Sequence, residues 1–198
     1  MTIRAGQAWG QAIAPPDDPL VVRRDVDLAD AVARGERRPL LLRGGDVHTA
    51  LGAPQGPATT RLALDVMHVE AAGFCGVAVA HVLARPPGRR GWWHGPLAVV
   101  ANVDHVGAWD VAPRAHPGDG RLDVVEVAAT MPVRARWQAW RRLPTGTHVP
   151  HPDITARRVE RAELAFPEPL GLWVDGVARG RASSVSVWLE PDAVDVYV

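Results

Sequence analysis

The sequence predicts an α+β fold that is mostly β, with a C-terminal β-sandwich and a smaller α/β unit in front of it. From Thr59 onward, short segments such as 61–66 and 77–83 alternate apolar and polar residues, which is the period of a strand with one buried face. Turn residues, for example Pro86-Pro87-Gly88 and Gly118-Asp119-Gly120, separate these segments. Before Thr59 the pattern changes to that of a strand, a helix and a second strand.

The α/β unit is expected over residues 1–55. Leu20-Val21-Val22 is a short apolar run typical of a strand, and a helical spacing of apolar residues follows it. Asp25 or Asp27 is the expected N-cap of that helix, because a short carboxylate side chain can accept a free amide of the first turn. The glycines and prolines of residues 52–57 are the best candidate for a linker to the next domain.

The β-sandwich is expected over residues 58–198, with one helix that begins at Pro132. Val133, Trp137 and Trp140 share one face of this helix, which we expect to be buried. The arginines of the helix are expected to face solvent: Arg134, Arg136, Arg141 and Arg142. Cys75 is expected to be a small buried residue without a redox role. Five tryptophans in periodic segments are expected in the core: Trp109, Trp137, Trp140, Trp173 and Trp188.

Composition excludes several classes of protein. The 22 basic residues are all arginine and are balanced by 22 acidic residues, so no overall field favours nucleic acid, and lysine chemistry is absent. A single cysteine excludes a disulfide framework within the chain. No signal-peptide pattern is present, and no apolar run approaches the ~20 residues that span a bilayer. We therefore expect a soluble, cytoplasmic protein without a transmembrane segment.

A family resemblance begins at Val100-Ala101-Asn102 and continues through Val111-Ala112-Pro113-Arg114-Ala115 to Gly118-Asp119-Gly120-Arg121-Leu122-Asp123. In order and spacing these residues resemble the C-terminal domain of the diacylglycerol kinase family, which includes bacterial lipid kinases and sphingosine kinases. Gly146-Thr147-His148 and Trp173-Val174-Asp175-Gly176 resemble later motifs of the same domain. The resemblance implies a β-sandwich and covers residues 97–198 well.

The N-terminal unit departs from the family pattern. The family's nucleotide-binding domain carries a glycine-rich loop between a strand and a helix, where this sequence has Arg23-Arg24-Asp25. Backbone amides converge on a phosphate only where no side chains intervene, so the two arginines oppose that arrangement. The resemblance therefore implies a vestigial α/β unit, shaped like the end of a nucleotide-binding domain. The segment between Asp65 and Val100 is also short, which implies a truncated lipid pocket.

The resemblance also implies candidate site residues. Asp175 matches the family's candidate catalytic base, and Asp119 matches a carboxylate that helps hold magnesium, with Asp25 as a further candidate ligand. Val177 stands where the family has a second carboxylate, so magnesium affinity should fall steeply. The alternative for Asp175 and Asp119 is a structural role in turns, which Asp-Gly pairs commonly have.

Other candidate sites follow from the residues alone. Gly44-Gly45-Asp46 before a short helix could bind an anion or cofactor phosphate through its amides, with Arg43 adding charge, or it could be an ordinary turn. Arg89, Arg90, Trp92 and Trp93 mix cations with indoles, which suits a membrane interface or an acidic partner, although the two indoles could instead pack beneath the sandwich or at a dimer contact.

Clustered histidines are weak metal candidates. His148, His151 and Asp153 lie close in sequence, and so do His116 and Asp119, but neither group has a helical spacing or a cysteine.

Three functions remain open at this point. The first is a reduced, catalytically inactive relative of the lipid kinases, a pseudokinase that binds a small ligand, a lipid or a protein, with no cofactor. The second is an active lipid kinase that uses magnesium–ATP, either alone or completed by a partner chain, with Asp175 as base, Asp119 and Asp25 at the metal, and Arg23 or Arg24 at the phosphate. The third is a scaffold that forms a homodimer. No nucleic-acid partner is expected.

Overall fold

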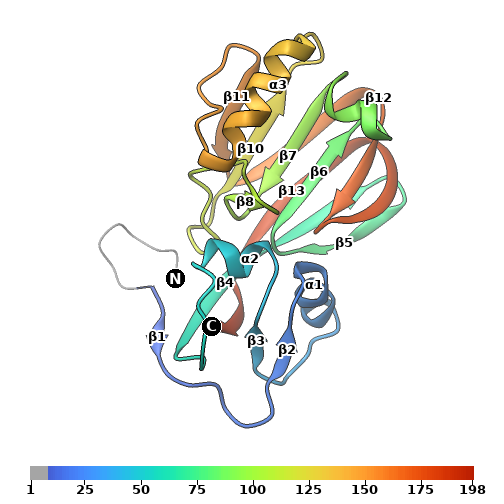
Figure 1. Cartoon of the computed structure of the whole chain (residues 1–198). Coiled ribbons are helices and arrows are strands. Elements are labelled where there is room, and N and C mark those ends of the chain that lie inside the picture. Colours follow the sequence, from blue (N-terminus) through green and yellow to red (C-terminus); the bar gives the residue numbers. More distant parts are fainter. Residues whose placement is uncertain (1–8) are drawn as a thin grey trace.

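Long antiparallel strands dominate the computed structural model, which describes residues 9–198 (Figure 1). Eleven strands form one sheet in the order β1-β4-β13-β12-β6-β7-β10-β11, with β5 paired to β4 and the pair β2 and β3 joined through β13. The strands β8 and β9 form a separate hairpin.

The elements have the following bounds. The strands are β1 (Gln11–Ala12), β2 (Leu20–Val22), β3 (Leu40–Leu42), β4 (Thr60–Ala71), β5 (Phe74–Ala78), β6 (His81–Arg85), β7 (Leu97–Ala101), β8 (His105–Val106), β9 (Trp109–Asp110), β10 (Leu122–Val127), β11 (Ile154–Val159), β12 (Arg161–Val174) and β13 (Val177–Tyr197). The helices are α1 (Asp25–Ala33), α2 (Asp46–Ala50) and α3 (Val133–Arg142), with 3-10 turns η1 (Arg89–Trp92) and η2 (Leu143–Thr145).

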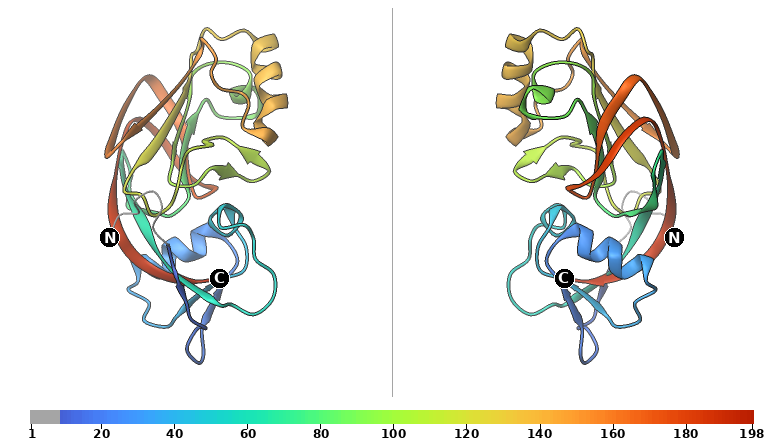
Figure 2. Two further views of the ribbon diagram at one scale, coloured as in Figure 1. Left: turned by 90° about the vertical axis from the view of Figure 1, so that its left-hand side faces the viewer. Right: turned by 90° about the vertical axis from the view of Figure 1, so that its right-hand side faces the viewer.

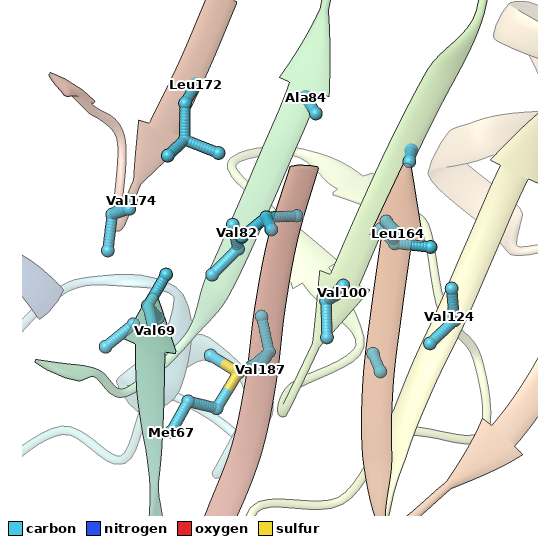
Figure 3. Packing of buried hydrophobic residues seen from close by; sticks show 14 of the residues in the cluster. Met67, Val69, Val82, Ala84, Val100, Val124, Leu164, Leu172, Val174 and Val187 are labelled. Carbon is cyan, nitrogen blue, oxygen red and sulfur yellow. The ribbon is translucent and has the colours of Figure 1, made fainter. Parts of the chain in front are cut away.

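The predicted sandwich is confirmed, and its central strands are buried on both faces. Val82 of β6, Val100 of β7 and Val124 of β10 point into an inner core, where they meet side chains such as Val187 of β13 (Figure 3). The alternate residues of the same strands point to the opposite face, where a second cluster lies under α3. This double burial follows from the period of two, since successive side chains leave opposite sides of a strand.

The N-terminal unit packs against the lower ends of β4 and β13 (Figures 1 and 2). β2 and β3 pair in parallel, and β3 continues the sheet by pairing in parallel with the end of β13, where Leu40 lies opposite Val196. Side chains from α1, β2, β3, β4 and β13 share one hydrophobic cluster. The predicted linker, residues 52–57, lies between α2 and β4, while residues 1–8 of the predicted unit lie outside the described residues.

The prediction for the buried face of α3 is wrong. Trp137 and Trp140 are 46% and 44% exposed, whereas Arg136 is only 5% exposed. The helix instead turns Ala135, Arg136 and Ala139 inward. The inward position of Arg136 is stable because its guanidinium donates hydrogen bonds to several backbone carbonyls, which replaces the water that it loses.

Three smaller expectations also need correction. Cys75 is exposed rather than buried. The predicted strand 77–83 is interrupted after Ala78, so that its two halves belong to β5 and β6. Arg24, not Asp25 or Asp27, occupies the N-cap of α1, and Asp25 is the first residue of the helix. The carboxylate of Asp25 is directed toward the start of α2.

The inner core gives the first testable prediction. Leu122 is fully buried on β10, so Leu122→Ala should lower the free energy of unfolding by about 2 to 5 kcal/mol through lost burial and a residual cavity. Urea denaturation measures this change. The matched control is Ile13→Ala, which truncates a side chain that is 50% exposed and should change stability by less than about 0.5 kcal/mol. Equal effects of the two variants would contradict this packing.

Candidate functional site

Asp25 binds the start of α2. Its carboxylate accepts the amide of Asp46 at 2.6 Å and the amide of Val47 at 3.0 Å. Gly45, at φ +91°, is required for this approach, because a Cβ there would lie 2.5 Å from Asp25 Oδ1. Burial raises the pKa of Asp25, and the two amides partly oppose the rise. The amides that could receive a phosphate are thus occupied by an anion of the chain itself.

Asp175 makes a similar set of contacts at the turn between β12 and β13, where its own φ is +46°. Oδ2 accepts the amide of Val79 at 2.9 Å, and Oδ1 accepts the amides of Ala80 and His81, each at 3.0 Å. Burial raises the pKa of Asp175 to about 7, although the three amides favour the charged form. Both oxygens are therefore engaged with the turn between β5 and β6.

His81 and Asp46 complete a buried group with these two carboxylates. His81 Nδ1 lies 3.5 Å from Asp46 Oδ2, while Asp46 Oδ1 accepts the amide of Gly107 at 2.9 Å. Burial lowers the pKa of His81, and the charge of Asp25 opposes that shift. We call Asp25, Asp46, His81 and Asp175 the junction cluster, because they join the N-terminal unit to the sandwich.

Arg23 and Arg24, the two arginines expected at a phosphate, have exposed side chains. Arg24 is exposed and donates two hydrogen bonds to Asp27, at 2.9 and 2.6 Å. The side chain of Arg23 is exposed, while its carbonyl packs against Gly44, where a Cβ would approach to 2.5 Å. The loop at Gly44 and Gly45 is thus closed against the start of α1.

Asp119 belongs to a different group. Its carboxylate pairs with Arg158 and accepts the amide of Arg121 at 3.0 Å. Arg158 also contacts Asp123, at 3.2 Å. The structure thus brings Asp25 together with Asp175 but not with Asp119. Across residues 9–198, no three His, Cys, Asp or Glu side chains are placed to hold a metal ion.

The remaining histidine candidates are also separated. His148 is buried, whereas His151 Nδ1 accepts the amide of Asp153 at 3.1 Å. His116 packs edge-on against Trp9, with ring centroids 4.5 Å apart.

An apolar pocket of about 350 Å³ lies between α3 and the outer face of the sandwich. Its floor is formed by strand residues that include Leu83, Val99 and Val125, and α3 contributes Ala139. Its aromatic walls are Trp92, Trp93, Trp109 and Trp140. The sequence analysis did not identify this pocket. The sequence feature that could have indicated the pocket is the apolar character of both faces of β6, β7 and β10, because a strand with two apolar faces requires a second covering layer.

Two polar side chains line the apolar pocket. Arg136 has its guanidinium engaged with backbone carbonyls, among them Ala128 at 2.8 Å, Met131 at 3.3 Å and Gly95, so it closes the pocket rather than offering free donors. His148 is 3% exposed, and neither ring nitrogen has a hydrogen-bond partner within the described residues. Burial lowers the pKa of His148, so the ring is neutral at pH 7, and an interaction with the Val111 backbone opposes the shift.

The predicted surface of arginines and tryptophans is divided by the structure. Trp92 turns inward, with the Arg85 guanidinium 4.4 Å above its ring and Trp109 edge-on at 5.6 Å. Arg89 and Arg90 remain exposed on η1. Trp93 is partly exposed and contacts Trp140, with ring centroids 6.3 Å apart, so it connects η1 to α3.

Comparisons with known proteins agree with the fold. The family model of the YegS C-terminal NAD kinase beta sandwich-like domain matches residues 62–198. A crystal structure of a diacylglycerol kinase from Bacillus anthracis str. Sterne has 15% sequence identity and a TM-score of 0.63, covering 91% of this chain and 76% of that chain. A candidate diacylglycerol kinase from the same organism has 14% identity and a TM-score of 0.66, covering 91% and 78%. No curated protein sequence matches the chain.

The raised pKa of Asp175 predicts how the stability of the protein changes with pH. Folded Asp175 holds its proton to about pH 7, whereas an unfolded Asp ionises near pH 4. Between these values the folded state binds more protons, so this residue's contribution to stability is full at low pH and is lost as pH rises, by at most about 1.4 kcal/mol per pH unit. Asp175→Asn cannot ionise, so the stability advantage of wild type over the variant should shrink from pH 5 to pH 8.

Urea denaturation of both proteins at pH 5, 6, 7 and 8 tests this prediction. Histidines and other carboxylates titrate in both proteins, so their effects largely cancel in the difference. A difference in free energy of unfolding that stays constant over this range would show that Asp175 is ionised throughout.

Proposed function

Since the chain belongs to the family of the YegS C-terminal NAD kinase beta sandwich-like domain, we propose that it is a reduced, catalytically inactive relative of the diacylglycerol kinases that binds a small ligand with an apolar chain. The observation that carries this proposal is the apolar pocket beneath α3. Its volume of about 350 Å³ lies within the usual range of ligand pockets, about 300 to 1,000 Å³.

The chemistry of the pocket walls favours a hydrocarbon chain with one polar end. Aliphatic and indole side chains form the walls, and each buried methylene would contribute about 0.8 kcal/mol to binding. The unpartnered ring nitrogens of His148 would gain a hydrogen bond from a hydroxyl or carbonyl of the ligand. A ligand of this kind satisfies both the apolar walls and the one polar group that lacks a partner.

The junction cluster supports the absence of catalysis. Phosphoryl transfer requires amides or cations around the phosphates and a base that can reach the substrate hydroxyl. Here the amides of Asp46 and Val47 are bound by Asp25, and both oxygens of Asp175 face backbone amides. A pKa near 7 would suit a base, but the burial that raises it also separates the carboxyl from solvent.

An active lipid kinase remains the second candidate, favoured by the likeness to the diacylglycerol kinase structures. In this candidate Asp175 is the base, and a partner chain would supply the missing phosphate and metal contacts. Breaking the amide contacts of Asp25 and Asp175 would be needed first.

The pocket prediction uses Ala139, which is half-buried on α3 and lines the pocket. Ala139→Trp should fill the cavity and weaken binding of a fluorescent fatty acid at least tenfold, because the indole occupies the space of the chain. Gln138→Trp is the matched control, since it adds the same side chain at an exposed position of the same helix. Fluorescence titration measures both dissociation constants. Equal affinity in the two variants, or no saturable binding to wild type, would contradict the proposal.

The two candidates also differ in their response to nucleotide. Isothermal titration of the protein with magnesium–ATP should give no saturable heat, and labelled phosphate should not be transferred to diacylglycerol. Phosphate transfer by wild type that is lost in Asp175→Asn would reject the proposal of an inactive protein and support the active lipid kinase. The Asp175→Asn protein must first be shown to be folded by circular dichroism.

A further inference from the structure

Beside the pocket, α3 carries an apolar stripe that nothing in the described chain covers. Val133, Trp137 and Trp140 are each 44% to 46% exposed, and they follow one another at helical spacing. Trp93 of the neighbouring turn extends the stripe through its contact with Trp140. Figure 2 shows α3 at the outer edge of the molecule beside η1, at the end away from the N-terminal unit. Two indoles on one helix that are each nearly half exposed are unusual for a surface that meets only water.

The two sequence segments that carry this stripe hold charges of one sign. Residues 71–103 and 128–152 contain no Asp or Glu, although the whole chain is neutral. Five exposed arginines lie in these two segments: Arg89, Arg90, Arg134, Arg141 and Arg142. Arg141 stacks on the Trp137 ring at 4.9 Å, which places a cation directly beside the stripe. Asp153, at the end of the second segment, lies near the buried Arg136.

The stripe and the apolar pocket meet at Trp140. This residue lines the pocket and is also 44% exposed, and its neighbour Trp93 lines the pocket as well. The pocket therefore opens beside the stripe, and a surface that covers the stripe also faces the pocket.

We propose that this Trp–Arg face, formed by Trp93, Val133, Trp137, Trp140 and the five exposed arginines, docks on an anionic lipid bilayer and places the pocket against it. Indoles lie well at the interface between water and hydrocarbon, and arginines bind the phosphates of anionic lipids while their stems remain in apolar surroundings. The docking depends on the proposed function in one respect: the bilayer would supply the ligand whose apolar chain enters the pocket.

A bilayer fits this face better than an acidic protein or a nucleic acid does. The apolar part is a helix stripe with a pocket of matching chemistry beside it, which a hydrocarbon layer can contact continuously. The arginines surround the stripe rather than forming a separate basic track. None of the helices within residues 9–198 is long and apolar enough to cross a membrane, so the contact proposed here is peripheral.

Vesicle flotation tests the docking with the full chain. Wild type should bind phosphatidylcholine vesicles that contain 30 mol% phosphatidylserine, and should bind pure phosphatidylcholine vesicles at least tenfold less. The double variant Val133→Ser, Trp137→Ser should lose at least tenfold in binding to the anionic vesicles. Its control is Ile13→Ser, Val21→Ser, which changes two exposed apolar residues of the N-terminal unit and should bind like wild type.

A charge pair of variants tests the arginines. Arg90→Gln, Arg134→Gln should reduce binding to the anionic vesicles by roughly thirtyfold, because each arginine near such a surface contributes about 1 kcal/mol. Arg34→Gln, Arg37→Gln removes the same charge from the exposed surface of the N-terminal unit and should leave binding unchanged. Salt at 0.5 M should weaken wild-type binding, since the charge contribution is screened.

The outcomes separate this proposal from the alternatives. Equal binding to anionic and neutral vesicles, or unchanged binding of the Trp137 double variant, would overturn it. A dimer in light scattering that Val133→Ser, Trp137→Ser dissociates, together with no vesicle binding, would assign the face to a second copy of this chain. Ala139→Trp should still float with anionic vesicles although it binds fatty acid at least tenfold more weakly. Flotation of wild type without fatty-acid binding would reject the proposed ligand and retain the docking.

Discussion

Buried carboxylates that accept backbone amides hold this structure together. Asp25 receives two amides from the start of α2, Asp175 receives three from the turn between β5 and β6, and Asp65 receives those of Gly120 and Asp192 at 2.7 and 2.9 Å. A buried charge without partners would be strongly destabilising, and here amides from distant parts of the sequence supply the partners. Asp46 connects the N-terminal unit to the sandwich, because its carboxylate accepts the amide of Gly107 at 2.9 Å and lies 3.5 Å from His81 Nδ1.

The two ends of the molecule differ in their chemistry. At the junction, the amides and carboxylates that a phosphoryl-transfer site would use are already bonded to one another. At the opposite end, α3 and η1 cover one face of the sandwich incompletely and leave the apolar pocket, with His148 as its unpartnered polar group. A fold similar to that of the diacylglycerol kinase structures is therefore present together with an apolar pocket at one end and carboxylates bonded to backbone amides at the other.

The sequence predicted the sandwich well because alternation over a period of two is a local signal, and residues 61–66 and 184–189 carried it clearly. It failed where a long-range partner decides the outcome. Arg136 is buried because backbone carbonyls accept hydrogen bonds from its guanidinium. Trp137 is exposed because Ala135, Arg136 and Ala139 occupy the inner face of the helix. The role of Asp25 could not be predicted from the sequence either, because its hydrogen-bond partners lie about twenty residues later in the chain and approach it only through the loop at Gly45. The pocket forms only when segments between Leu83 and Ile154 come together.

The central claim is that the amides of Asp46 and Val47 are held by Asp25 and are closed to phosphate. Amide proton and nitrogen chemical shifts of Gly45, Asp46 and Val47, followed during a titration with magnesium–ATP, test it most directly. These three signals should stay in place up to millimolar nucleotide. Saturable shifts confined to these amides would contradict it, because they would show that a phosphate displaces the carboxylate.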